Sequence, residues 1–452
     1  MKDIGARHFS SAYAIHRPFF LAGIITVLSV GCLWGAVNLL LMGLRQSFGG
    51  VNYSWVLAHG HAMVFGFVGF FIMGFAYQAI PRFKDAALWR PDIALSALPL
   101  MAIGIGLQIL AHLIAKRPPF LELGLAAGLF QFAAVAIFAS VIVRTIRQAQ
   151  KPEGYDGFIY AALGWFLLAA IFNPVIFWLF ETASDTNQFL FRIAIFNIPY
   201  RDVELFGIAV MMILGVSLRY LPQAYALHTP SNRWRIFLLL GTNSAIVVGI
   251  IMSMLRNLFV FRQNFSAGNQ WLMMVQEGAA IILLIAAVGA FWQYRLFSSV
   301  KDSDFGYGLK FIRAAYVWFI VAMAMLVLVP VYNLLVYQPL TGARIPFSHA
   351  FFGAYRHALT VGFITMMIIG VSSKVATTFS GLEAQRNNSL WATFLLLNLG
   401  NAARILTEIA TDFTPAAYPL TGMTGFIELF GLALWGYELL RNMYVRTHLE
   451  RA

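Results

Sequence analysis

The chain has 452 residues, of which 60% are hydrophobic and only 11% are charged. Its mean hydropathy of +0.74 excludes an ordinary soluble domain and indicates a polytopic membrane protein. The net charge of +12 is spread over the connecting loops, so membrane topology explains it better than nucleic-acid binding does. The single cysteine, Cys32, excludes a disulfide and a metal site made of several cysteines.

Apolar windows separated by charged or Gly/Pro-rich connectors predict twelve membrane spans. They fall at 19–44, 55–80, 91–115, 120–143, 157–180, 202–226, 234–255, 270–294, 311–337, 351–376, 389–409 and 421–443. The first apolar run is too long for the core of a signal peptide, so it is assigned as a span. Most of the 31 Lys and Arg residues fall on the side of the N-terminus, and the positive-inside rule therefore places both termini in the cytoplasm.

Histidines stand near the start of two spans. The stretch 55–83 carries His59 and His61, and its counterpart 351–381 carries His357. Ionisable side chains inside a membrane span are costly and usually functional. We therefore expect the fold to bring the histidines of spans two and ten together.

A short pattern recurs in spans two, six and ten. In each, a glycine precedes a proline or threonine by seven residues: Gly74 and Pro81, Gly215 and Pro222, Gly370 and Thr377. Because the copies lie four spans apart, they predict three four-helix modules, at about 19–148, 157–297 and 309–445, related by pseudo-threefold symmetry. The alternative is coincidence, since Gly and Pro are common in membrane helices.

These stretches resemble known proteins. The pattern His-Gly-x-x-Met-x-Phe at 59–65, with the later Gly74 and Pro81, resembles span two of the heme-copper oxidase catalytic subunit, and 357–381 resembles its span ten. More closely, the runs at 16–23, 59–66 and 356–363 resemble the NnrS family. Those are twelve-span bacterial proteins described as containing heme and copper and linked to nitric oxide stress. The resemblance therefore implies an all-α, heme-copper-oxidase-like membrane fold.

The chain departs from the oxidases at the oxygen-reducing centre. Tyr355 stands where they have the histidine that binds the high-spin heme, and Asp202 stands at the position of a copper ligand. The histidine pair of span seven is missing from 234–255. Since imidazole is the ligand that suits such a copper ion, an oxygen-reducing site of this kind is not expected, and enzymatic activity is left open.

The low-spin ligand pair remains. The resemblance implies that His59 and His357 bind one heme b from both sides, with copper as a second metal. Arg356 and Arg404, at outer helix ends, are candidate partners of the heme propionates, although Arg356 could instead extend to lipid headgroups. His61 lies about 200° around the helix from His59, so the two cannot hold one ion together. His61 is either a further metal ligand or a hydrogen-bonded interfacial residue. Whether His59 or His61 is the axial ligand stays open.

By this resemblance we expect a heme-binding protein of the bacterial cytoplasmic membrane, surrounded by lipid and acting in nitric oxide or nitrosative-stress physiology. Two alternatives remain. One is an electron-transfer subunit that receives electrons from quinol, and the other is a twelve-span transporter without a cofactor. No nucleic-acid partner is expected.

Overall fold

The computed structural model describes residues 15–114, 117–149, 151–261, 267–300, 306–343, 347–379 and 389–445. Within these ranges the chain is helical and has no strand, which confirms the predicted all-α fold. Among these described residues, eleven helical segments are long and apolar enough to cross a membrane. The chain is therefore a multi-pass membrane protein.

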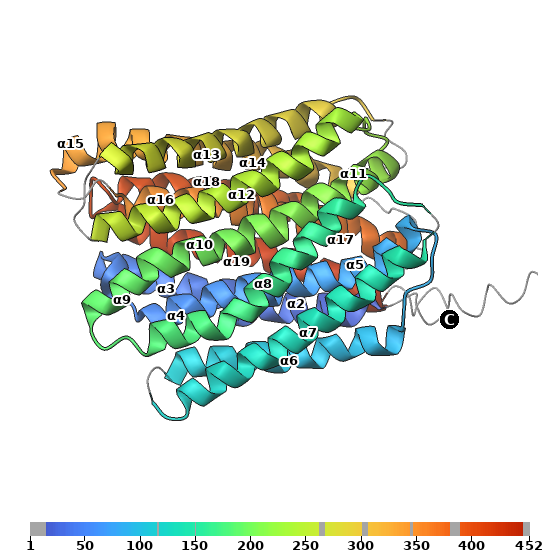
Figure 1. The fold of residues 1–452 in the computed structure, drawn as a ribbon, viewed down its shortest axis with the longest axis horizontal. Helices are drawn as coiled ribbons and strands as arrows, with labels where there is room; N and C mark the ends of the chain where they lie inside the picture. Colours follow the sequence, from blue (N-terminus) through green and yellow to red (C-terminus); the bar gives the residue numbers. More distant parts are fainter. Residues whose placement is uncertain are drawn as a thin grey trace, which may run out of the picture. The chain divides into compact units, whose positions relative to one another are not determined.

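Long helices joined by short connections make up the chain (Figure 1). The α-helices are α2 (His16–Thr26), α3 (Cys32–Arg45), α4 (Tyr53–His61), α5 (Gly69–Phe83), α6 (Pro91–Ile114), α7 (Phe120–Gln148), α8 (Asp156–Glu181), α9 (Thr186–Arg192), α10 (Ile198–Asp202), α11 (Met211–Tyr225), α12 (Asn232–Phe261), α13 (Ala267–Tyr294), α14 (Gly306–Tyr332), α15 (Gln338–Thr341), α16 (His349–His357), α17 (Met366–Phe379), α18 (Ser389–Ala410) and α19 (Ala417–Leu440).

The span expected at 389–409 forms α18 but is not among the eleven segments. Its apolar side chains are interrupted by Asn398, Asn401, Arg404 and Glu408, which lower its mean hydropathy. Polar side chains in such a helix usually face the protein interior and serve a function.

The chain divides into two compact units, each described by itself. The first unit comprises Met1–Phe19, Ile72–Gln223 and His228–Gly289, and the second comprises Phe20–Phe71, Ala224–Leu227 and Ala290–Ala452. The second unit contains all five residues that the sequence analysis selects for the cofactor: His59, His61, Arg356, His357 and Arg404.

In the second unit, small residues let α3 and α19 approach closely. A Cβ atom added to Gly43 would lie 2.9 Å from the carbonyl oxygen of Tyr418, and one added to Gly425 would lie 2.9 Å from Cα of Ala36. Small residues at such crossings are the usual means by which membrane helices pack. The packing places α19 against the helix that begins at Cys32, and α18 packs on α19 as well.

Each copy of the repeated pattern contains a π-helical segment in the same position. The segments are η3 (Ala62–Val68), η5 (Val203–Val210) and η7 (Ala358–Thr365), and each begins 12 residues before its glycine, Gly74, Gly215 or Gly370. Short π-helical turns occur often at functional sites. The residues directly before them are His61, Asp202 and His357, so these three hold corresponding positions.

A second recurrence occurs once in each unit. In the first, the indole Nε1 of Trp165 donates a hydrogen bond to Oδ1 of Asn243 at 2.9 Å. In the second, Trp318 does the same to Asn398 at 2.9 Å. Each indole also lies where the Cβ of a glycine would be, at Gly207 and Gly362 respectively. This shared contact is in keeping with repeated modules, whose arrangement in space stays a prediction.

Candidate functional site

His59 is held by a backbone carbonyl of the preceding span. Its Nδ1 lies 2.8 Å from the carbonyl oxygen of Gly31. Because a carbonyl oxygen can only accept a hydrogen bond, Nδ1 carries the proton and Nε2 is left as the ring nitrogen with a lone pair. Metal-binding histidines typically donate their other ring nitrogen to a carbonyl or carboxylate in this way.

A local irregularity in the first span presents this carbonyl. Residues Val27–Gly31 form the π-helical segment η1, in which the N–H of Cys32 donates to Val27 rather than to the residue four positions back. Gly31 itself has φ −77° and ψ −106°, outside the helical region, which turns its carbonyl away from the helix axis. A regular helix would keep this oxygen within its own hydrogen-bond ladder.

Two glycines make room for the side chains of span two. A Cβ atom on Gly35 would lie 2.5 Å from Cε1 of His59, and one on Gly31 would lie 2.9 Å from Sδ of Met63. The imidazole therefore lies directly against the backbone of α3. Any side chain at position 35 would have to displace it.

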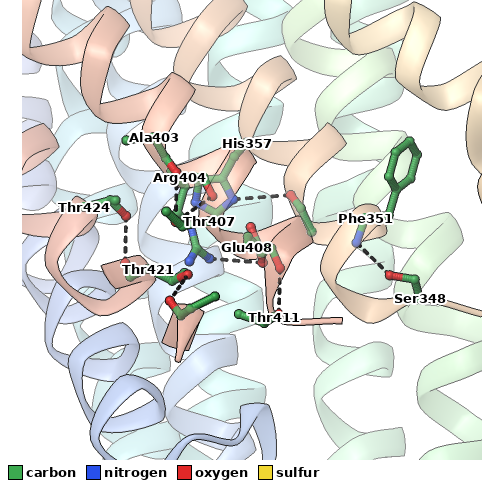
Figure 2. Close-up of polar contacts among 12 residues, drawn as sticks. Ser348, Phe351, His357, Ala403, Arg404, Thr407, Glu408, Thr411, Thr421 and Thr424 are labelled. Atoms are coloured by element: carbon green, nitrogen blue, oxygen red, sulfur yellow. Dashed lines mark hydrogen bonds and ion pairs between the residues drawn. The ribbon is translucent and has the colours of Figure 1, made fainter. Parts of the chain in front are cut away.

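His357 is the last residue of α16. It is far from His59 in the sequence but belongs to the same unit. Its Nδ1 lies 3.4 Å from the carbonyl oxygen of Gly353, one turn earlier in its own helix (Figure 2). This contact again assigns the proton to Nδ1 and leaves Nε2 with a lone pair. Arg404 and His59 are both near enough to His357 to influence its charge state. The two predicted ligands are thus within electrostatic range of one another.

Arg404 is buried beside His357, with 6% of its surface exposed. Its Nη2 lies 3.2 Å from Oε1 of Glu408, one turn further along α18 (Figure 2). Its Nε and Nη1 have no hydrogen-bond partner among the described residues. Either of these N–H groups can donate a charge-assisted hydrogen bond to a further carboxylate, such as a heme propionate.

Arg356 makes different contacts. Its guanidinium lies 4.6 Å from the centre of the Phe352 ring, and its Nε donates to the hydroxyl of Tyr355 at 3.4 Å. Both partners belong to α16. Both arginines therefore stay candidate partners of a heme propionate.

His61 is buried, with 2% of its surface exposed, and its ring stacks on Phe65 at 4.8 Å between ring centres. It shares α4 with His59 but points to another side of the helix, as the spacing of two residues requires. His61 corresponds to His357 in the repeat, whereas His59 has the hydrogen bond typical of a ligand. Which histidine binds the iron therefore stays a prediction.

A copper site is not apparent in the structure. Among the residues that can be described, no three His, Cys, Asp or Glu side chains gather closely enough to hold a metal ion. The thiol of Cys32 is buried and lies 4.0 Å from the carbonyl oxygen of Gly425. In the first unit, the buried carboxyl group of Glu204 pairs with Arg201 at 2.6 Å, an ion pair that is a structural role for this acid.

The sequence analysis missed a polar network in the first unit. Asn173 donates to Gln108 at 3.3 Å and to Gln131 at 3.0 Å, and Gln108 lies 3.4 Å from Nε2 of His112. His112 in turn lies 3.4 Å from Glu181. The five side chains come from α6, α7 and α8, of which α6 and α7 run side by side (Figure 1). The amide side chains of Gln108, Gln131 and Asn173 within apolar helices were a sign in the sequence of such a network. Which of them pair could not be predicted, because they are far apart in the chain.

Comparison with known proteins agrees with the resemblance noted in the sequence. The family model described as NnrS protein matches residues 13–442, nearly the whole chain. No curated protein matches the chain. The match covers both histidine-bearing spans and α18. The chain therefore belongs to the NnrS family, and this membership supports, at the level of the family, the description of a nitric-oxide-related membrane protein that binds heme or metal.

Proposed function

We propose that this protein holds one heme b between His59 and His357 and acts in nitric oxide or nitrosative-stress physiology. The observation that carries the proposal is the 2.8 Å contact between Nδ1 of His59 and the Gly31 carbonyl, because it orients an imidazole whose Nε2 is suited to iron. Membership of the NnrS family supports the same cofactor class.

The surrounding residues fit this group. His59 and His357 would each bind through Nε2, and Gly35 provides the close approach that the ring of His59 needs. Arg404 would donate to a propionate through Nε or Nη1, the nitrogens that Glu408 does not use. When bound, heme supplies one-electron redox chemistry. The chain's part is to fix the ligand orientation, balance charge and keep water from the site.

The two histidines are not held equally. Nδ1 of His59 lies 2.8 Å from its carbonyl, whereas Nδ1 of His357 lies 3.4 Å from its own. A hydrogen bond at the longer distance is weaker. Since two axial histidines leave no open position, nitric oxide could bind only after one leaves, and His357 is the one that we expect to leave.

Electron transfer is the second candidate function, with quinol as the electron donor. The observation that favours it is the pair of protonated Nδ1 atoms, since two oriented imidazoles need no rearrangement for electrons to pass. A transporter without a cofactor is the alternative that a spectrum excludes. We further propose that the protein resides in the bacterial cytoplasmic membrane with both termini inside, as the distribution of basic residues indicates.

The reduced-minus-oxidised absorption spectrum of the purified protein tests the proposal. We expect the sharp bands of a low-spin heme b and one iron per chain, with copper measured in the same sample. A preparation from heme-replete cells without such bands would refute the heme proposal. Binding of nitric oxide to the reduced protein at the expense of the low-spin bands would favour the first function over electron transfer alone.

A further inference from the structure

Four buried polar side chains lie on α18 and α19 in the second unit. Asn401, Arg404, Glu408 and Glu428 are exposed by 0%, 6%, 4% and 5% respectively. Several of their atoms have no hydrogen-bond partner among the described residues: Nδ2 and Oδ1 of Asn401, Nε and Nη1 of Arg404, Oε2 of Glu408 and Oε1 of Glu428. Such groups cost several kcal/mol each, roughly, in a membrane interior. A set of this kind marks an ion or proton site by default.

The charges of this group do not balance. Arg404 and Glu408 are joined at 3.2 Å and neutralise each other. Arg404 and Glu408 both influence the charge state of Glu428, and Glu428 influences the thiol of Cys32 in α3. Among the four side chains of this group, Arg404 is the one cation, beside the two carboxyl groups of Glu408 and Glu428. Glu428 is the acid without the direct ion pair.

The packing around Glu428 keeps it within the protein. A Cβ atom on Gly400 would lie 3.2 Å from Cγ of Glu428, so this side chain passes directly over the glycine of α18. On the other side, α3 packs on α19. Burial disfavours the carboxylate form of Glu428 and a nearby positive charge favours it, so its protonation state depends on the charges around it.

The group adjoins the candidate heme site: Glu428 passes over Gly400, one turn before Arg404 in α18, and Oε1 of Glu408 lies where the Cβ of Gly353 would be, in the helix that carries His357. We propose that Glu428 is a redox-linked proton-binding residue: it takes up one proton at its carboxylate when one electron enters the heme. The proposal rests on the proposed function. The electron comes from a reduced quinol or an added one-electron mediator, and the proton comes from water. One negative charge is added and one is neutralised, so the net charge of the site is unchanged.

The midpoint potential of the heme, titrated at a series of pH values, tests this assignment. Uptake of one proton per electron lowers the potential by about 59 mV per pH unit, because a tenfold change in concentration corresponds to that shift for one electron. We expect the wild-type protein to approach this slope over part of the neutral range. Glu428→Gln should have a nearly flat profile, with its low-spin spectrum retained.

Glu438→Gln is the matched control. Glu438 is a buried acid on the same helix, but it pairs with Arg441 at 3.6 Å. This variant should keep the wild-type slope. A slope that persists in Glu428→Gln, or that disappears only in Glu408→Gln, would overturn the assignment.

Infrared difference spectroscopy on the wild-type protein covers the case in which Glu428→Gln loses its heme. Reduction should produce the carbonyl band of a newly protonated carboxyl group, sensitive to deuterium exchange. A spectrum without this band would overturn the proposal. A wild-type protein with heme but a potential independent of pH refutes only the role of Glu428, whereas a protein that binds no heme refutes the proposed function itself.

Discussion

The carbonyl oxygen of Gly31 accepts a hydrogen bond from Nδ1 of His59 at 2.8 Å, across 28 residues of sequence. The contact joins an irregular turn of the first span to the start of the second. It selects the tautomer of the imidazole and limits its rotation, which are the two properties that a heme ligand needs from its surroundings. The predictions below begin with this contact.

Gly35→Ala should disturb heme binding although residue 35 is not a ligand. The new Cβ would lie 2.5 Å from Cε1 of His59, closer than atoms can approach, so the ring must move. We expect a cost of about 1–3 kcal/mol in stability, as for other overpacked sites, and a loss of the low-spin spectrum. Heme content and thermal unfolding in detergent measure the two effects.

Gly106→Ala is the control for that variant. Apart from its chain neighbours and the backbone of its own helix, no atom of the described residues lies within 4 Å of a Cβ added to Gly106, which is also in the middle of an apolar helix. The substitution should leave heme content unchanged and should not lower the unfolding temperature. Equal behaviour of the two variants would show that the close approach at Gly35 has no role in the site.

Arg404→Met should be strongly destabilising by itself. It leaves Glu408 buried without its partner, and breaking a buried ion pair in this way costs about 3–5 kcal/mol. The double variant Arg404→Met/Glu408→Leu removes both charges and should recover most of that loss. If Arg404 also holds a propionate, heme affinity will stay reduced in the double variant. Recovery of both stability and heme affinity would restrict Arg404 to a structural role.

Asp412, in the connection between α18 and α19, predicts a dependence of stability on pH. Burial raises the pKa of its carboxyl group, while hydrogen bonds from Ser348 at 2.6 Å and Tyr332 at 2.9 Å oppose the shift. Because the folded state binds its proton more tightly than the unfolded state, this residue's contribution is most favourable below the unfolded pKa of about 3.9. It is lost as the pH rises through the raised, folded pKa.

Asp412→Asn should remove this loss of stability at rising pH. Unfolding temperatures of the variant and the wild-type protein, measured at a series of pH values, test this. Asp185 provides a control of opposite sign, since it caps α9 by accepting a hydrogen bond from the N–H of Gln188 at 2.9 Å, which lowers its pKa. Its contribution is present above the unfolded pKa and is lost as the pH falls through the folded pKa. Asp185→Asn should therefore leave the decline at rising pH in place. A decline that survives in Asp412→Asn would assign it to another group.

Hydropathy was sufficient to predict the helical fold, because a membrane interior allows few alternatives to long apolar helices. It also selected the spans that carry His59 and His357. It could not show the turn at Val27–Gly31, since the hydrogen-bond pattern of a π-helical segment leaves no trace in the spacing of apolar residues. Nothing in the sequence distinguishes Gly31 and Gly35 from glycines that only allow helices to pack closely.

Long-range polar partners were also beyond prediction. His112 had no evident partner in the sequence, and the structure brings Glu181 to 3.4 Å from it through the packing of two helices. Arg404 was selected from its place near a helix end, but its pairing with Glu408 and its position beside His357 depend on how α18 packs. Such contacts require the tertiary arrangement, which one sequence does not specify by inspection.

The three histidine variants provide the most direct comparison. His59→Ala and His357→Ala should each lose heme or convert it to a high-spin form, because a site that lacks one axial imidazole holds its iron less firmly. His61→Ala should keep the low-spin spectrum, since its ring stacks on Phe65 and points to another side of α4. Absorption spectra and heme content of the purified variants measure the outcome.

The alternatives give different results in this comparison. If none of the three histidines binds heme, all three variants will behave alike. If His61 is the ligand, as its position before a π-helical segment like that of His357 would allow, His61→Ala will lose heme while His59→Ala retains it. The hydrogen bond from His59 to Gly31 favours the first outcome, because it orients the imidazole as metal-binding histidines are typically oriented. Loss of heme in His59→Ala and His357→Ala, with His61→Ala unchanged, would therefore identify the axial pair.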